Sequence, residues 1–183
     1  MSICHEIKGS RRLIGRLQCG SDLLDGLSRI CVEENVKLGW VEALGAVSKA
    51  RLTCYDQEAR EYRSIEMDRE LEITALVGNV SLKDGKAMLH AHVTLADETG
   101  RAYGGHLASG TIIFACEFII QVFDAPILTR SFDVETGLQL WKERPLNLRD
   151  LGQSQGTPQT DMHPNHAHTA NVFMQTREER SLF

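Results

Sequence analysis

The sequence lacks a cysteine framework and lacks long apolar runs. Its five cysteines are odd in number and widely scattered, and none belongs to a Cys-x-x-Cys pair. This pattern argues against structural disulfides and favours a reducing compartment. The N-terminal residues show no apolar signal core, and no apolar run approaches membrane-spanning length. We therefore expect a soluble, cytoplasmic protein.

An excess of basic residues is also missing. Twenty Lys and Arg residues are outnumbered by 25 Asp and Glu residues, which gives a formal net charge of −5. The only basic run is Arg11-Arg12. Proteins that bind nucleic acids broadly displace counterions with clustered Lys and Arg side chains. The charge balance therefore argues against a broad nucleic-acid interface.

The composition indicates one globular domain followed by a tail. The 183 residues are 42% hydrophobic and 25% charged, which is ordinary for a globular chain. From about Glu143 the sequence becomes polar and poor in packable side chains. We predict a domain over residues 1–142 and a flexible tail over residues 143–183. The tail contains His163, His166 and His168, which could bind metal adventitiously but more simply belong to a segment without a site.

Apolar periodicity predicts a mainly β domain with one clear helix. The helix follows Ser21 as its N-cap, carries Asp22 in its first turn and ends near residues 35–37. A long strand starting at Trp40 contains Gly45, where we expect a bend or bulge. The other strands are expected at residues 12–18, 62–67, 71–81, 111–123 and 128–134.

The strand over residues 111–123 is apolar on both of its alternating faces. Even-numbered residues from Ile112 to Val122 form one face, and odd-numbered residues from Thr111 to Gln121 form the other. We expect both faces to be covered, one of them by a helix or a neighbouring subunit. Glu117 interrupts the odd-numbered face, and a buried carboxylate needs a cation, a hydrogen-bond donor, a metal or water.

Three histidines fall within a short segment that has the pattern of a β-hairpin. A three-residue loop, Glu98-Thr99-Gly100, with Gly100 in the left-handed conformation would pair His92 with His106. Because side chains alternate along a strand, His90 would then share the same face, opposite an apolar face. A slip of one residue would move His106 to the core. This register therefore predicts a cluster of three imidazoles.

An ordered set of motifs surrounds these histidines and resembles the plants-and-prokaryotes-conserved (PPC or PCC) domain over roughly residues 8–141. The motifs are Ala43–Ser48, Gly78–Ser81, Asp84-Gly85, Leu89–Val93, Gly104–Leu107 and Glu117. The resemblance implies an α+β fold, a largely antiparallel β-sheet with few helices, that forms homotrimers. It also implies bound metal at His90, His92 and His106.

In plants this domain accompanies AT-hook DNA-binding motifs, so the resemblance also implies DNA binding. The present sequence contains no Arg-Gly-Arg-Pro hook. The hook is the part that enters the DNA minor groove, and its absence argues against direct DNA binding by this chain.

Three neutral imidazoles would suit a divalent transition metal such as zinc, nickel, copper or iron(II). Three ligands leave a fourth position open. The plainer alternative is a group of solvated or interface histidines with hydrogen-bond partners. Glu117 could be a further ligand or could orient a ligating histidine, or it could form a salt bridge across a subunit interface.

These observations and the resemblance predict a non-enzymatic homotrimeric module that binds a metal or small ligand and a protein or DNA partner. The alternative is a metal-dependent enzyme of unknown substrate that uses His90, His92 and His106, with Glu117 or Glu42 as general base. No catalytic residue is assigned. A direct DNA-binding regulator is a third hypothesis, which the charge balance disfavours.

Overall fold

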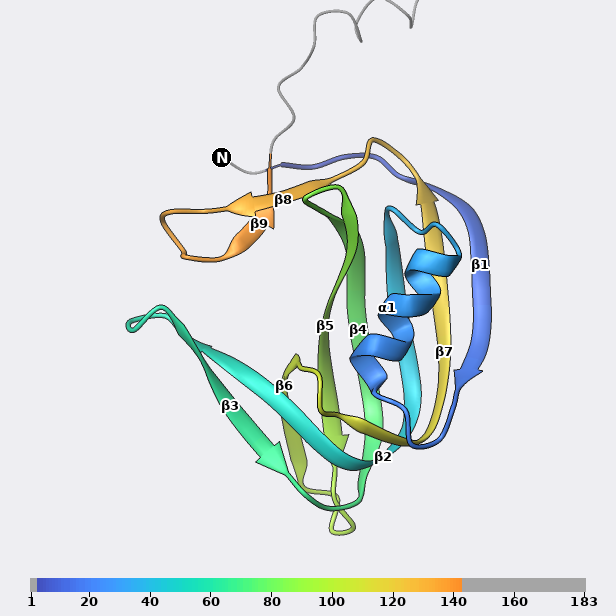
Figure 1. The fold of residues 1–183 in the computed structure, drawn as a ribbon, viewed down its shortest axis with the longest axis vertical. Helices are drawn as coiled ribbons and strands as arrows, with labels where there is room; N and C mark the ends of the chain where they lie inside the picture. Colours follow the sequence, from blue (N-terminus) through green and yellow to red (C-terminus); the bar gives the residue numbers. More distant parts are fainter. Residues whose placement is uncertain (1–2, 143–183) are drawn as a thin grey trace, which may run out of the picture. The chain divides into compact units, whose positions relative to one another are not determined.

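The computed structural model describes residues 3–142, and the predicted tail with its three histidines lies outside this range. The described residues form nine strands and one helix, which confirms the α+β class and the mainly antiparallel sheet (Figure 1). The elements are β1 (Lys8–Leu17), α1 (Leu23–Glu33), β2 (Gly39–Asp56), β3 (Glu61–Met67), β4 (Leu71–Lys83), β5 (Lys86–Ala96), β6 (Ala102–Leu107), β7 (Ile112–Asp124), β8 (Thr129–Phe132) and β9 (Gln139–Trp141).

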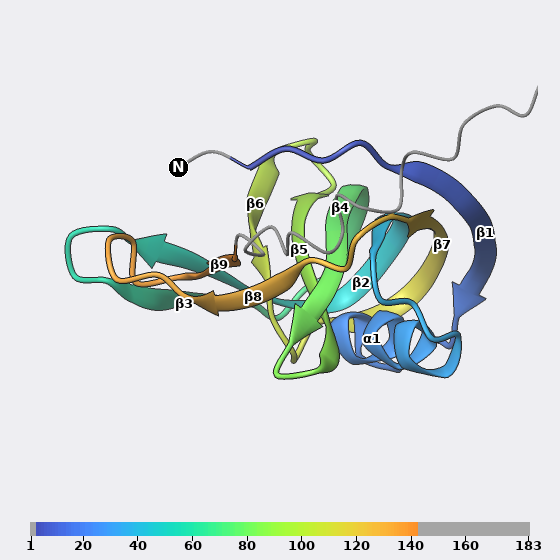
Figure 2. The same cartoon turned by 90° about the horizontal axis from the view of Figure 1, so that it is seen from above.

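The long strand β2 organises the sheet. Its first half pairs with β7 on one side and β4 on the other, and its second half pairs with β3 and β6. Since β4 pairs with β5 and β5 with β6, the strands β2, β4, β5 and β6 form a closed circuit. Strand β1 extends the sheet beyond β7, and β8 and β9 extend it beyond β4. Helix α1 lies along one face (Figure 2).

The bend or bulge that we predicted at Gly45 is present in β2. The register with β4 shifts between Ala43 and Gly45, and Gly45 has a φ of 145°. A Cβ at this position would overlap the backbone carbonyl of Ala115 on β7. Glycine is therefore required here by both its conformation and the close approach of the neighbouring strand.

Helix α1 packs as expected but begins one residue later than predicted. Its apolar stripe, formed by Leu23, Leu27 and Cys31, is buried in the core. The N-cap is Asp22, whose Oδ1 accepts from the backbone N of Asp25 at 2.9 Å, and the prediction of Ser21 was wrong. The Ser21 hydroxyl instead donates to the Gln18 carbonyl at 2.6 Å.

A second bulge corrects the prediction for β7. Ala46 pairs with Ala115 and Val47 with Ile113, so Phe114 is an extra residue opposite β2. This extra residue reverses the alternation, and Ile113 joins Cys116 in the core while Phe114 is 65% exposed. The outward face of β7 is exposed within residues 3–142, and the expectation that a neighbouring subunit covers it stays a prediction.

None of the helices that the structure describes between residues 3 and 142 has the length and apolar character needed to span a membrane.

Candidate metal centre

The hairpin of β5 and β6 has the predicted register. His92 pairs with His106 and Thr94 pairs with Gly104. Gly100 ends the three-residue loop with a φ of 79°, and its backbone N donates to the Asp97 carbonyl at 2.8 Å. The turn chemistry therefore sets the alignment of the two strands that carry the histidines.

Asp97 organises this loop through both carboxylate oxygens. Oδ1 accepts from the Thr99 hydroxyl at 2.6 Å and from the backbone N atoms of Thr99 and Arg101 at 3.0 Å. Oδ2 accepts from the Tyr103 hydroxyl at 3.0 Å. These hydrogen bonds, led by that of the Thr99 side chain, lower the pKa of Asp97 to about 2.

We expect Asp97→Asn to lower the Tm by several degrees at pH 7, because an amide cannot accept all four hydrogen bonds. The folded-state pKa lies below the unfolded value, so the carboxylate stabilises the fold above about pH 4. The difference in Tm between Asp97→Asn and wild type should therefore shrink as the pH falls from about 4 to about 2. Calorimetry across this range measures it, with Asp84→Asn in the exposed β4–β5 turn as control. Equal Tm values for Asp97→Asn and wild type at pH 7 would contradict this role.

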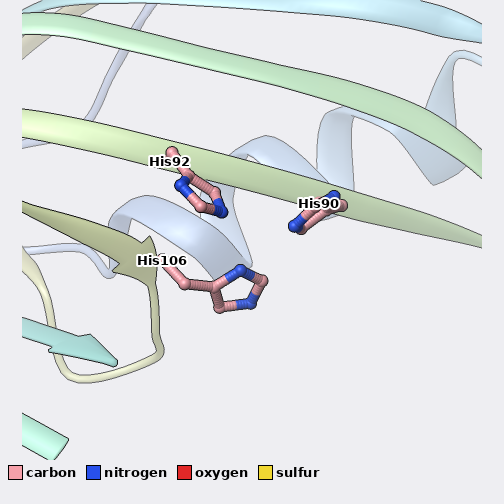
Figure 3. A group of neighbouring side chains, drawn as sticks. All are labelled: His90, His92 and His106. Atoms are coloured by element: carbon pink, nitrogen blue, oxygen red, sulfur yellow. The ribbon is translucent and has the colours of Figure 1, made fainter. Parts of the chain in front are cut away.

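The three histidines converge from two strands onto one side of the sheet. Figure 3 shows His90 and His92 extending from β5 toward His106 on β6. Their ring centroids lie 4.9–5.4 Å apart, and one ligand nitrogen from each lies within 4.8 Å of the others. His92 is exposed and the other two are half-buried. The predicted cluster is therefore present.

The opposite side of the hairpin explains why the imidazoles share one face. Leu89, Val93, Leu95 and Leu107 are buried in the core. Since successive side chains point to opposite sides of a strand, burying these residues directs the histidines outward.

The protonation of the cluster suits metal binding. Burial is the main cause that lowers the pKa of His90, to about 4, and the neighbouring His106 and Arg130 lower it further. Burial, with His92 and Arg130, also lowers the pKa of His106. Both imidazoles are consequently neutral at pH 7, and a neutral ring nitrogen is what a metal ligand requires.

The geometry of the donors also fits a small transition-metal ion. Zinc binds histidine nitrogens at about 2.0–2.1 Å, so tetrahedral ligands lie roughly 3.3 Å from one another. The nitrogens of the cluster lie within 4.8 Å, and rotations about χ1 and χ2 can close the remaining gap. The residues present therefore fit a metal held by three imidazoles.

Glu117 does not join the cluster within the described chain. It is exposed on β7, where it pairs with Arg16 of β1 and Leu44 of β2, and the histidine group includes no carboxylate. Glu42 is separated from His92 by one strand, since both pair with Val77 on β4, which places their backbones roughly 10 Å apart. Both glutamates instead line a pocket of about 390 Å³ on β2, β4 and β7.

Two other residues beside the histidines were missed in the sequence. The Tyr62 ring lies 5.6 Å from that of His106, and Arg130 on β8 hydrogen-bonds Asn79, the cross-strand neighbour of His90. Arg130 is 51 residues from Asn79 in the chain. No local spacing could indicate this contact.

Comparisons with known proteins agree with the fold and the motifs. A metal-containing protein from Archaeoglobus fulgidus is 38% identical, with a TM-score of 0.74, and the match covers 78% of this chain and all of that one. A plant- and prokaryote-conserved protein from Pyrococcus horikoshii is 30% identical, with a TM-score of 0.73, over 79% of this chain and all of that one.

A longer protein contains a related segment. The bifunctional protein GlmU of a Synechococcus strain is 36% identical over 112 residues, which is 61% of this chain but only 16% of GlmU. The family model of the Plants and Prokaryotes Conserved (PCC) domain matches residues 5–124, close to the range of the motifs. The chain therefore belongs to the Plants and Prokaryotes Conserved domain family.

Proposed function

We propose that this protein is a non-enzymatic, homotrimeric binding module that holds a divalent transition metal, with zinc as the first candidate, on His90, His92 and His106. The observation that carries the proposal is the convergence of three imidazoles, two of them held neutral by burial, from adjacent strands. The relative from A. fulgidus, described as a metal-containing protein, supports it.

The three histidines would supply the nitrogen ligands and leave a further position for water or a small ligand. A metal bound in this way supplies a Lewis-acidic positive charge at that position. The chain's own contribution is to keep the imidazoles neutral and to fix their spacing through the β5–β6 register.

The trimer is supported by an uncovered apolar surface. Ile14, Leu44, Val77 and Ile119, which we name the outer apolar face, line one pocket across strands β1, β2, β4 and β7. All four are exposed in the described chain, Ile14 by 82%. Contiguous exposed apolar side chains mark interaction surfaces. A second and third copy of the chain would cover this face.

The enzyme alternative has less support. A general base must lie within hydrogen-bond reach of the proton it removes, directly or through one water molecule. In the described chain Glu42 and Glu117 lie in a different pocket from the histidines. The geometry thus favours binding over catalysis.

Metal analysis of protein purified without a tag tests the proposal. After incubation with zinc and dialysis, we expect about one ion per chain by mass spectrometry. A variant that combines His163→Ala, His166→Ala and His168→Ala should give the same ratio, because the site lies in the hairpin. Zinc at far less than one ion per chain in both proteins would refute the metal site.

DNA binding is expected to be weak. With a net charge of −5 and no hook, the chain has little counterion-displacing surface. Fluorescence anisotropy with a 30-base-pair duplex at physiological salt should give a dissociation constant no tighter than the nonspecific range of roughly 10⁻⁴–10⁻⁶ M. Tight, sequence-specific binding would contradict this expectation and favour a DNA-binding regulator over a metal-binding module.

A further inference from the structure

A second pocket opens beside the histidines. It has a volume of about 490 Å³, within the range of small-molecule sites, and His90 and His106 form part of its wall. Tyr62 from β3 and Arg130 from β8 also line it. None of the described residues that line this pocket is an aspartate or glutamate. In an acidic chain, this is a locally positive cavity.

Arg130 is held in place by neutral groups. Its Nε donates to the Ser81 hydroxyl at 2.8 Å, its Nη1 to the Gln139 carbonyl at 2.8 Å and its Nη2 to the Asn79 Oδ1 at 2.7 Å. No Asp or Glu of residues 3–142 forms an ion pair with it. Three of its five N–H groups are thus used in the described chain, which leaves two N–H groups and a full charge.

The position of Arg130 relative to the histidines follows from the sheet register. Asn79, which accepts from Arg130, is paired directly with His90 across β4 and β5. Side chains of such pairs lie roughly 5 Å apart at their Cβ atoms. The Arg130 guanidinium on β8 and the imidazoles of His90 and His106 therefore face the same pocket.

An apolar wall completes the pocket. Leu138 and Leu140 come from the β8–β9 hairpin and Met88 from β5. The tip of this hairpin is tied to the β2–β3 hairpin, since the Tyr55 hydroxyl donates to the Thr136 carbonyl at 2.8 Å and Arg60 donates to the Val134 carbonyl at 3.2 Å. A ligand that fills the pocket would meet hydrocarbon on one side and positive charge on the other.

We propose that this pocket binds a small organic oxyanion. Its carboxylate or phosphate head would lie between Arg130 and the open position of the histidine-held metal, and its hydrocarbon body would contact Met88, Leu138 and Leu140. An unpaired guanidinium in a partly buried pocket favours an oxyanion because charge-assisted hydrogen bonds are stronger there. The inference rests on the proposed function, since the metal would supply the second positive contact.

Cobalt(II) in place of zinc gives a direct optical readout, because its visible spectrum changes when a ligand enters the open position. Cobalt-loaded protein is titrated with butanoate, butyl phosphate and butan-1-ol. We expect at least one of the two anions to shift the spectrum with saturation, and we expect no shift with the alcohol. The anion that binds with the higher affinity identifies the preferred head group.

Variants then assign the second contact. The Arg130→Gln variant should bind about one cobalt per chain. Its affinity for the anion should fall at least tenfold, because a charge-assisted hydrogen bond is lost. The Arg130→Lys variant keeps the positive charge and should lower the affinity for the anion by a smaller factor. If Arg130→Gln does not fold, this variant decides the result. Arg29→Gln, at an exposed position on α1, is the matched control and should behave as wild type.

The two proposals fail in different ways. No cobalt binding by the wild-type protein would overturn both. Cobalt bound at about one ion per chain with no response to either anion, or with equal anion affinity in wild type and the Arg130 variants, would overturn the oxyanion site alone. An equal response to butan-1-ol would also overturn it, because the pocket would then not select charge.

Discussion

Replacing His92 by alanine is expected to reduce the bound metal from about one ion per chain to less than a tenth of that value. Loss of a residue that only orients a ligand typically weakens metal binding by about 10–100-fold, and removing one of three ligands should exceed this. His92 is the exposed member of the cluster, so its truncation leaves no cavity in the core. Mass spectrometry after dialysis against a weak chelator measures the ratio.

Two controls separate the site from adventitious binding. His5→Ala removes an exposed histidine outside the cluster and should leave the ratio unchanged. The His92→Ala change should also be made in the background that lacks His163, His166 and His168, so that these side chains cannot hold the ion. If His92→Ala retained the wild-type stoichiometry in that background, the three-histidine site would be wrong.

A glutamate in place of Ile14 is expected to convert a trimer into a monomer. Ile14 is 82% exposed on β1 and pairs with Ile119, a second member of the outer apolar face. In the single chain the new carboxylate stays in water and costs little. In an assembly that covers this face, each subunit would bury an unpaired charge, at a cost of several kcal/mol.

Light scattering coupled to size-exclusion chromatography measures this effect. The wild-type mass should be three times the 20.5 kDa of the chain, and the mass of Ile14→Glu should equal that of one chain. Val32→Glu places the same charge at an exposed apolar position on α1 and should leave the trimer intact. A monomeric wild type would remove the explanation for the outer apolar face, and a trimeric Ile14→Glu would place the interface elsewhere.

The two variants also test whether metal binding and assembly depend on each other. His92 lies on β5, and its cross-strand row continues through Val77 of β4, a member of the outer apolar face. The two features are therefore adjacent on one surface. We expect His92→Ala to keep the wild-type mass, because truncating an exposed imidazole introduces no charge into the interface.

Local rules were enough to predict the histidine hairpin. The loop Glu98-Thr99-Gly100 fixes the pairing of His92 with His106, and the alternation of buried residues fixes which way they point. The same kind of rule located the bulge at Gly45 and the helix that starts near Asp22. In each case the residues that signal the feature lie within a few positions of one another in the chain.

Local rules failed where a distant segment decides the conformation. The N-cap moved from Ser21 to Asp22, whose carboxylate also accepts from the backbone N of Gly110, 88 residues away. The alternation of β7 reversed at Phe114 because an extra residue opposite β2 had to be accommodated. The periodicity of each segment does not reveal its distant neighbour, which is Gly110 for the helix start and β2 for β7.

The sequence by itself determined the class of the fold, the family and the three converging histidines, because strand alternation and turn chemistry act over short distances. The tertiary structure alone decided the surroundings of those histidines. It placed Arg130 beside Asn79 and Tyr62 beside His106, and it separated Glu117 from the cluster. The physical reason is that these positions depend on which strands pair, and strand pairing is settled by packing across the whole sheet.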